Sequence, residues 1–313
     1  MVIAVICDVL GEANNGTTIA SLNLIGALRD RGHTVRVVCA DPSMAGKQDY
    51  YVVPQFNFGP FNPYLQKNGV APAKAEHRLL EAAIADVDVI HVMLPFALGK
   101  AAAEYAAVHG IPLTAGFHCQ AENITNHLLL KDFHPGNQLT YQVLYRRLYR
   151  HCDCIHYPTE FIRDTFEAVV GPTPHRVISN GVGREFVPPA QERRPDGVFR
   201  VLFTGRYSRE KSHRVLIDAV AKSCFRDRIQ LIFAGTGPLE EQLRHHAARR
   251  GIAPPVMRFY SRSELIDVIQ GADLYVHPAE IEIEAISCLE AIACGRVPLI
   301  ADSPRSATRA FAL

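Results

Sequence analysis

Short apolar runs alternate with longer helical patterns along the whole chain. The apolar runs of the first half are VIAVICDV, TVRVVCA, DVIHVMLP, PLTAGFH, CIHYPT and RVISNGV. Between them lie stretches of helical periodicity such as IASLNLIGALRDRGH and FALGKAAAEYAAVHG, and Gly32 and Gly110 stand where a C-terminal helix cap is expected. Apolar strands that alternate with helices are typical of a parallel sheet covered on both faces.

The alternation is interrupted once and then restarts. Residues 184–198 are rich in proline and charge, which predicts a linker. Helices are then expected from Ser212 and Leu239, between the strand runs FRVLFTGRY, IQLIFAGTG, VMRFYSR, LYVHP and VPLIAD. We therefore predict an α/β fold of two Rossmann-like, doubly wound domains, 1–183 and 199–313, facing across a cleft. The second domain is expected to be truncated, since no closing helices follow its last strand.

Composition and charge exclude several classes of protein. The formal net charge of +1 argues against nucleic acid as the main partner, because phosphate binding requires a basic surplus. No apolar run approaches the roughly 20 residues that cross a bilayer, and MVIAVICDVL does not read as a signal peptide. Scattered cysteines indicate a reduced, cytoplasmic protein. Neither CDC at 152–154 nor DVD at 86–88, a predicted strand start, is expected to bind a metal.

A pair of cations follows the first strand of the second domain. In FTGRYSREKSH, Arg206 comes directly after the strand and Lys211 precedes the helix expected from Ser212. Many such spacings occur in solvated basic loops. Here the carboxyl end of a strand and the N-terminus of a helix add backbone donors and a positive dipole, which favours a site for a diphosphate.

The stretch AEIEIEAISCLEAIACG, residues 279–295, places glutamates in an apolar run. A carboxylate without partners in such surroundings costs several kcal/mol or becomes protonated. We expect Glu282 in the loop before a helix and Glu290 within it, where both can accept hydrogen bonds from the vicinal hydroxyls of a sugar or ribose. Glu280 is expected to be a solvated helix residue.

Two residues of the first domain are also candidates. Gly16, in NNGTT between the first strand and helix, allows close approach of a ligand, but it is also compatible with a simple turn. The glycine spacing is not GxGxxG, which disfavours a nicotinamide dehydrogenase. His118 follows the strand in TAGFHC, where it either packs in the core or contacts a sugar hydroxyl.

The segment LTYQVLYRRLYRHC, residues 139–152, predicts an amphipathic helix. Tyr141 and Leu144 belong to its apolar stripe, and Arg146, Arg147 and Arg150 face the other way. A core-facing helix with a cationic outer face explains this pattern. The alternative is that the arginines contact anionic lipid at a membrane surface.

Taken together, these motifs resemble the family-four retaining glycosyltransferases of GT-B fold. The resemblance covers essentially the whole chain. It rests on the Glu282-x7-Glu290 element with EAIACGRVPLIA, the loop at Gly16, ISNGV, TGR with Lys211, and AGTGPL. VHPAEIEIEAISCLEAIACG and FTGRYSREKSH are similar to the bacterial diacylglycerol glucosyltransferase-like proteins. One departure is EIEA in place of EGFG, which puts Glu284 where an aromatic residue is usual.

The resemblance implies donor-binding roles for residues of the second domain. Arg206 and Lys211 would hold the donor diphosphate. Glu290 would bind the ribose hydroxyls, Glu282 the transferred sugar, and Ile286 between them would contact the donor.

It also implies roles for three further residues. Gly16 would meet the donor phosphate from the first domain, and Tyr260 would frame the base. His118 would stand near the reacting sugar, so His118 and Glu282 are the predicted catalytic residues.

The predicted function is therefore transfer of a hexose from a nucleotide-diphosphate sugar, with UDP as the expected nucleotide, to an acceptor hydroxyl. The acceptor is expected to be a diacylglycerol-type lipid at the inner face of the membrane, and no metal is expected, because cations and helix N-termini neutralise the leaving group. Two alternatives stay open: a nucleotide-sugar epimerase of similar fold, and a non-catalytic nucleotide-binding fragment.

Overall fold

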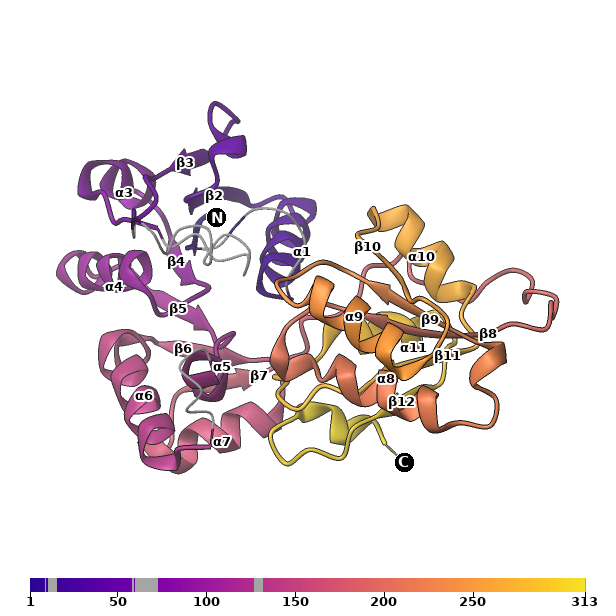
Figure 1. Ribbon diagram of the computed structural model, residues 1–313. Helices are drawn as coiled ribbons and strands as arrows, with labels where there is room; N and C mark the ends of the chain where they lie inside the picture. Colours follow the sequence, from indigo (N-terminus) through magenta and orange to yellow (C-terminus); the bar gives the residue numbers. More distant parts are fainter. Residues whose placement is uncertain (9, 11–15, 58, 60–72, 127–131, 313) are drawn as a thin grey trace. The chain divides into compact units, whose positions relative to one another are not determined.

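The computed structural model describes the chain except residues 9, 11–15, 58, 60–72, 127–131 and 313. It divides into two compact units, Met1–Asn180 and Gly181–Leu313 (Figure 1). The segment 184–198 belongs to the second unit, where Phe186 is buried in the core and Arg193 binds Asp273 at 2.8 Å. Among the described residues, no helix is both long and apolar enough to span a membrane.

The first unit is built on a parallel sheet of order β3-β2-β1-β4-β5-β6-β7. Its strands are β1 Val2–Cys7, β2 Thr34–Cys39, β3 Tyr50–Val52, β4 Val89–Val92, β5 Leu113–Gly116, β6 Cys154–Tyr157 and β7 His175–Val177. The order reverses at β1, so right-handed crossovers place helices on both faces. Figure 1 shows α1 on one side of the sheet and α3 and α4 on the other. The predicted doubly wound sheet is confirmed.

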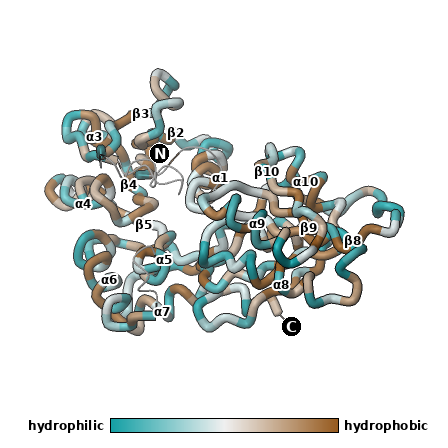
Figure 2. Tube along the Cα trace, in the orientation of Figure 1, coloured by the Kyte–Doolittle hydropathy of each residue, from teal (hydrophilic) through white to brown (hydrophobic). Residues whose placement is uncertain are grey.

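The helices of this unit are α1 Gly16–Asp30, α3 His77–Ile84, α4 Ala97–His109, α5 Ala121–Asn126, α6 His134–Arg147 and α7 Glu160–Val170. Figure 2 shows hydrophobic and hydrophilic residues alternating along α3 and α6, as expected for helices packed on a sheet. Gly110 caps α4 in the left-handed conformation, as predicted, and the Thr159 hydroxyl caps α7 by accepting from the Ile162 N–H.

The helix expected over residues 139–152 ends earlier than predicted. α6 stops at Arg147, because Leu148 takes a non-helical conformation and a 3₁₀ turn, Tyr149–His151, follows. The turn carries Tyr149 into the core, where its hydroxyl donates to the carbonyl of Gly116 at 3.3 Å. Leu148 and Cys152 are nevertheless buried, and the predicted outward direction of the arginines is confirmed. These exposed arginines are Arg146, Arg147 and Arg150.

Sequence analysis also placed DVD at a strand start, and the structure confirms it. Asp86 binds Arg36 at 2.5 Å, and the Asp88 carboxylate accepts from the Val2 N–H at 2.7 Å. These contacts fasten the amino ends of β1, β2 and β4, far from the edge at which ligands of parallel sheets bind. The short edge strand β3 was not predicted, because its half-buried residues lack an apolar pattern.

The second unit has a parallel sheet of order β10-β9-β8-β11-β12. The strands are β8 Phe199–Thr204, β9 Ile229–Ala234, β10 Val256–Arg258, β11 Leu274–His277 and β12 Pro298–Ile300. The helices are α8 His213–Lys222, α9 Glu240–Arg250, α10 Arg262–Gln270 and α11 Ile286–Ala293. Buried Phe203, Ile217 and Phe233 lie in the core between the sheet and α8 and α9, while Tyr275 of β11 and Cys288 of α11 belong to a second core cluster.

Glycines join the carboxyl ends of β8 and β9. The Gly205 N–H donates to the Ala234 carbonyl at 2.9 Å, and a Cβ at Gly235 would lie 2.1 Å from the Gly205 carbonyl oxygen. Gly235 also has a φ of 156°, which side-chain-bearing residues rarely adopt. A Cβ at Gly237 would likewise meet the Tyr207 backbone at 2.6 Å. The loop that leads to Lys211 therefore rests directly on the backbone after β9.

We predict that Gly235→Ala destabilises the second unit by on the order of 3 kcal/mol, because strain and a backbone clash act together. Urea unfolding followed by hydrogen exchange of peptides from β8 and β9 measures the loss. Gly26→Ala is the control: this exposed helical glycine has open space around its Cβ, so the change should stabilise α1 by roughly 0.5–1 kcal/mol. Equal stability of Gly235→Ala and wild type would contradict the prediction.

Candidate functional site

The carboxyl ends of β8 and β11 bring three charged or polar side chains together. Lys211, in the 3₁₀ turn Arg209–Lys211 after β8, donates from Nζ to Oε1 of Glu282. His277, the last residue of β11, lies with Nε2 2.9 Å from the same oxygen. The carboxylate can only accept, so His277 carries its proton on Nε2. Sequence analysis predicted Lys211 and Glu282 here, but not His277.

The second ring nitrogen of His277 also has a polar contact. Its Nδ1 lies 3.2 Å from the Tyr275 hydroxyl, which in turn lies 3.0 Å from the Thr204 hydroxyl on β8 and 3.3 Å from Ser287 on α11. The imidazole is fully buried. This chain of polar contacts crosses two strands and a helix, so the direction of Glu282 is fixed by the core of the unit.

The charge on Glu282 is secured by its partners. Burial alone would raise the pKa of its carboxyl group, but the Lys211 ammonium and the hydrogen bond from His277 lower that pKa to about 2. The side chain is 11% exposed, so little solvent screens the ion pair. Glu282 is therefore ionised at every physiological pH.

The segment after β12 holds the backbone of the glutamate loop. The Glu282 N–H donates to the Arg305 carbonyl at 3.3 Å, and the Glu282 carbonyl accepts from the Ala307 N–H at 2.9 Å. Arg305 also forms an ion pair with Glu280. The expectation that Glu280 is a solvated helix residue is thus wrong: it lies in the loop before α11 and is paired.

Arg206 is linked to this cluster by another acidic residue, Glu210. Its guanidinium NH2 lies 3.3 Å from Oε1 of Glu210, which also accepts from the Ser208 hydroxyl. The Glu210 carbonyl in turn accepts from the Glu280 N–H at 2.8 Å. The cation loop and the glutamate loop are therefore joined by both backbone and side-chain contacts.

Two helices of the second unit begin beside these loops without a side-chain cap. Ser212 precedes α8 with φ 53° and Ala285 precedes α11 with φ 63°, both in the left-handed region. By contrast, Ser261 and Glu264 form a complete capping box on α10. Left-handed non-glycine residues are strained and concentrate at functional sites. Ile286 is the first residue of α11 and is buried, so the uncapped N–H groups begin there.

Glu290 lies one turn into α11 and belongs to a different cluster. Its Oε1 accepts from Arg262 NH1 at 3.1 Å, and its side chain is 3% exposed. Burial, together with the charge of Glu185, raises the pKa of Glu290 to about 7, although Arg262 acts to lower it. Sequence analysis expected Glu290 in the helix and Glu282 before it, which is confirmed. No contact joins the two carboxylates within the described residues.

Tyr260 is buried between β10 and α10 and packs in the same core cluster as Ala285 and Cys288. The guanidinium of Arg258 lies 4.1 Å from the centre of its ring. Its ring is therefore part of the core, and its predicted role toward a base stays a prediction.

Within the part of the chain that the structure describes, each glutamate of the E-x7-E element contacts the protein through one carboxylate oxygen and keeps the other oxygen unused. Oε1 of Glu282 meets Lys211 and His277, and Oε1 of Glu290 meets Arg262. Among the described residues, no hydrogen bond to Oε2 of either glutamate is found. A fixed carboxylate with an unused acceptor oxygen is suited to bind hydroxyl groups.

In the first unit, His118 follows β5 and its ring lies over Gly116. A Cβ at Gly116 would stand 2.4 Å from His118 Nε2, so glycine provides the space for this ring position. Nε2 is buried and has no hydrogen-bond partner within the described residues. Burial, with smaller contributions from His156 and His91, lowers the pKa of His118 to about 3, so the imidazole is neutral.

Gly16 is the exposed first residue of α1, and a Cβ there would meet open space. The rest of the predicted glycine loop, at 11–15, lies outside the described residues. Sequence analysis missed Asp8 at the end of β1. Its Oδ1 accepts from the Leu98 N–H at 3.3 Å, Oδ2 has no partner within the described residues, and burial raises its pKa to about 7.

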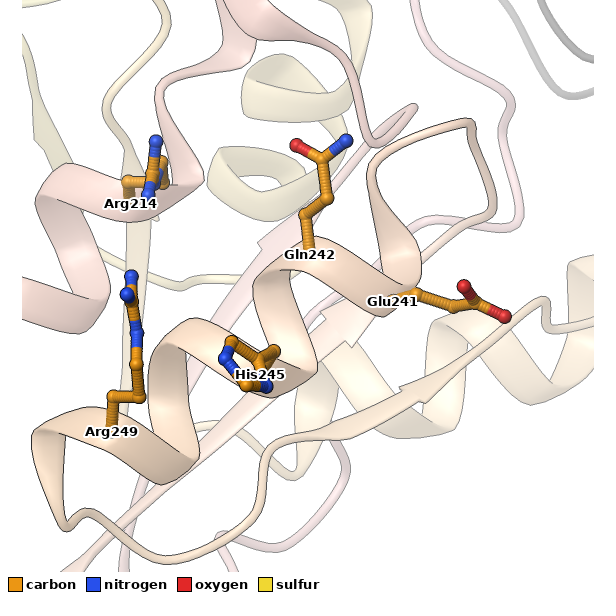
Figure 3. A pocket seen from close by; sticks show the side chains of 5 residues that line it. All are labelled: Arg214, Glu241, Gln242, His245 and Arg249. Carbon is orange, nitrogen blue, oxygen red and sulfur yellow. The ribbon is translucent and has the colours of Figure 1, made fainter.

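A hollow also lies on the outside of α8 and α9 (Figure 3). It is lined by Arg214, Glu241, Gln242, His245 and Arg249. All five side chains belong to exposed positions, and none of the residues predicted from sequence lies there. Within the described residues, no group of three or more His, Cys, Asp or Glu side chains could hold a metal ion.

Two doubly wound parallel-sheet units with charged residues at the carboxyl ends of the strands define the GT-B class of glycosyltransferase folds. The family model for "Glycosyltransferase Family 4" matches residues 14–186, and that for "Glycosyl transferases group 1" matches residues 188–310. The chain belongs to glycosyltransferase family 4, as its motifs predicted.

Two curated relatives are similar to parts of the chain. Alpha-monoglucosyldiacylglycerol synthase of Streptococcus pneumoniae is 25% identical over 69% of this chain and 52% of its own length. GDP-mannose:cellobiosyl-diphosphopolyprenol alpha-mannosyltransferase of Xanthomonas campestris is 32% identical over 45% of this chain and 38% of its own. The chain thus spans about half, or less, of the length of these relatives.

Solved structures support the fold. Anabaena HepE in complex with UDP and glucose matches 97% of this chain and 81% of its own, with 18% identity and a TM-score of 0.71. Sucrose-phosphate synthase from Thermosynechococcus elongatus matches 100% and 83%, with 16% identity and a TM-score of 0.77. At these identities the likeness establishes the GT-B fold alone.

The raised pKa of Glu290 predicts a pH-dependent stability. The folded state keeps the proton up to about pH 7, whereas the unfolded chain releases it near pH 4.5. Glu290 should therefore contribute a fall in stability of the second unit as the pH rises between these values, by on the order of 2 kcal/mol. Buried His213, whose pKa is lowered to about 3, contributes in the opposite direction, so the test is the difference between wild type and Glu290→Gln. The stability of wild type relative to Glu290→Gln should fall over this pH range, as measured by hydrogen exchange of β11 and α11 peptides.

Glu241→Gln, at an exposed position of α9, serves as the control and should keep the wild-type slope. The same pH dependence in wild type and Glu290→Gln would contradict the assignment.

Proposed function

We propose that this chain carries the donor site of a retaining glycosyltransferase that transfers a hexose from a nucleotide-diphosphate sugar to a hydroxyl group. One observation carries the proposal: fixed carboxylates that each keep an acceptor oxygen unused by the described residues, a lysine and uncapped helix starts share the carboxyl edge of one sheet. Family membership supplies the reaction class.

The charges at this edge fit the parts of such a donor. We assign the diphosphate to Lys211, Arg206 and the first N–H groups of α8 and α11, which favour anions. Glu282 then binds hydroxyls of the transferred sugar, and Glu290 those of the ribose. Ionised Glu282 accepts without donating, which suits sugar hydroxyls.

Catalysis in this proposal is electrostatic. The acceptor oxygen forms a bond to the anomeric carbon while the bond from that carbon to the diphosphate oxygen breaks. The leaving diphosphate takes the electron pair, and Lys211, Arg206 and the helix N–H groups stabilise its growing charge without a metal. Neutral His118 is proposed to contact the reacting sugar.

The names of the two relatives support retention. Both describe alpha products. Common nucleotide hexoses carry the sugar in alpha linkage, so an alpha product means retained configuration. One relative is named for glucosyl transfer and the other for GDP-mannose, and we propose UDP as the nucleotide here. The proposed acceptor is a diacylglycerol-type lipid, as in the name of the Streptococcus pneumoniae relative.

Lys211→Ala should weaken the binding of UDP by about 2–4 kcal/mol, because it removes a charged partner of the diphosphate and leaves Glu282 paired only with His277. Calorimetric titration with UDP and GDP, with and without EDTA, measures the change. Arg209→Ala, which removes an exposed cation from the same 3₁₀ turn, should leave the affinity within a factor of about 3. An unchanged affinity in Lys211→Ala would refute the diphosphate site.

The reaction itself is tested by mass spectrometry of nucleotide sugars incubated with lipid and soluble acceptors. Transfer of a hexose to a diacylglycerol lipid supports the proposal in full, and transfer to a soluble sugar alone contradicts the lipid acceptor. An altered nucleotide sugar formed without acceptor would identify an epimerase instead.

For the acceptor side we propose that α6 contacts an anionic membrane. Its outer face carries the exposed arginines Arg146, Arg147 and Arg150, the last in the turn that follows. Val143 and Leu139, 36% and 60% exposed, lie one and two turns before Arg146 on the same stripe. Exposed apolar and basic residues on one helix are typical of interfacial binding.

The triple variant Arg146→Ala, Arg147→Ala, Arg150→Ala should lose binding to vesicles with 30% anionic lipid, since each basic residue contributes about 1 kcal/mol near such a surface. Flotation assays measure the bound fraction. The matched control replaces the exposed basic residues Arg31, Lys47 and Arg78 of the same unit by alanine. Equal binding by the two triple variants would remove the proposed membrane contact.

A further inference from the structure

Arg262 is held in one position by three different contacts. It is the first residue of α10, and its Nε donates to Oε1 of Glu185 at 2.8 Å while NH1 donates to Oε1 of Glu290 at 3.1 Å. The centre of its guanidinium lies 4.5 Å from that of the Phe186 ring, which is buried. The plane of the guanidinium is therefore fixed by the segment 184–198, through Glu185 and Phe186, and by Glu290 of α11.

The chain around Arg262 is shaped to this arrangement. A Cβ at Gly183 would lie 2.6 Å from Arg262 NH2 and 2.4 Å from Glu185 Oε2, so glycine leaves room for this pair of side-chain ends. Ser261 and Glu264 cap α10 reciprocally, which fixes the helix start from which Arg262 projects.

Glu290 depends on this arginine. It is buried in a short helix near Ala291, Cys288 and Cys294, and among the described residues Arg262 is the side chain that donates a hydrogen bond to it. The other charged or titratable groups that act on it are Glu185 and Cys294. Without Arg262, which acts to lower the pKa of Glu290, the carboxyl group would keep its proton to a higher pH or turn toward solvent. In either case its free oxygen would no longer be a fixed acceptor.

We propose that Arg262 is the positioning residue for ribose recognition: by holding Oε1 of Glu290, it presents Oε2 to the vicinal hydroxyls of the donor ribose. The inference rests on the proposed donor site and adds a residue to it. Arg262 acts through Glu290 and does not itself contact the diphosphate. Loss of Arg262 should therefore weaken the binding only of nucleotides that have ribose hydroxyls.

The test compares UDP with 2′,3′-dideoxy-UDP by calorimetry in wild type, Arg262→Met, Glu290→Gln and the double variant. Methionine keeps the apolar stem of arginine but lacks the donors. We expect Arg262→Met to weaken UDP at least about tenfold, to change the dideoxy nucleotide less than about threefold, and to add no further loss to Glu290→Gln.

Arg262→Lys is the second variant, because it keeps the charge without the planar fork and should show the same ribose-specific loss in smaller measure. Arg250→Met, which removes from α9 an arginine paired with Asp218 of α8, should bind both nucleotides as wild type does. Hydrogen exchange of α10 and α11 peptides reports whether each variant is folded.

An equal loss for both nucleotides in Arg262→Met would show a merely structural role and overturn the inference. So would unchanged UDP binding. If wild type binds neither nucleotide, the proposed donor site fails, and the role of Arg262 fails with it.

Discussion

The second unit depends on one constraint: an ionised carboxylate in an apolar segment must have a cationic or donating partner. Leaving one unpaired costs several kcal/mol. The partners come from separate parts of the chain, Lys211 after β8, Arg262 on α10 and Arg305 after β12. Satisfying the glutamates therefore ties the turn after β8 and the segment after β12 to the loop before α11, and ties α10 to α11.

The pKa values of the two glutamates are shifted in opposite directions in the two clusters. Glu282 is met by a lysine and a histidine, so its pKa falls. Glu290 has one arginine, which it shares with Glu185, and this does not offset the cost of burial, so its pKa rises. In the proposed site, the carboxylate beside the transferred sugar is thus permanently charged, whereas that beside the ribose lies near its point of titration. The two carboxylates are eight residues apart in the sequence.

Much of the fold was predictable because buried parallel strands are apolar throughout and glycines mark the ends of helices. The short edge strand β3 and the end of α6 at Arg147 were not predictable, since the conformation of Leu148 is decided by packing of Tyr149. Motif spacing located Lys211, Glu282 and Glu290. It could not locate Arg262, because a contact across 28 residues leaves no local pattern. His277 lay within a recognised motif, yet its role in fixing Glu282 is evident only from the contacts of its two ring nitrogens.

The uncapped starts of α8 and α11 have a consequence for the protein before any substrate arrives. Uncapped N–H groups at helix starts beside a lysine attract small anions from the medium. Inorganic phosphate or sulfate in a buffer would occupy this position in competition with the nucleotide. Measured affinities would then depend on the choice of salt as well as on the protein.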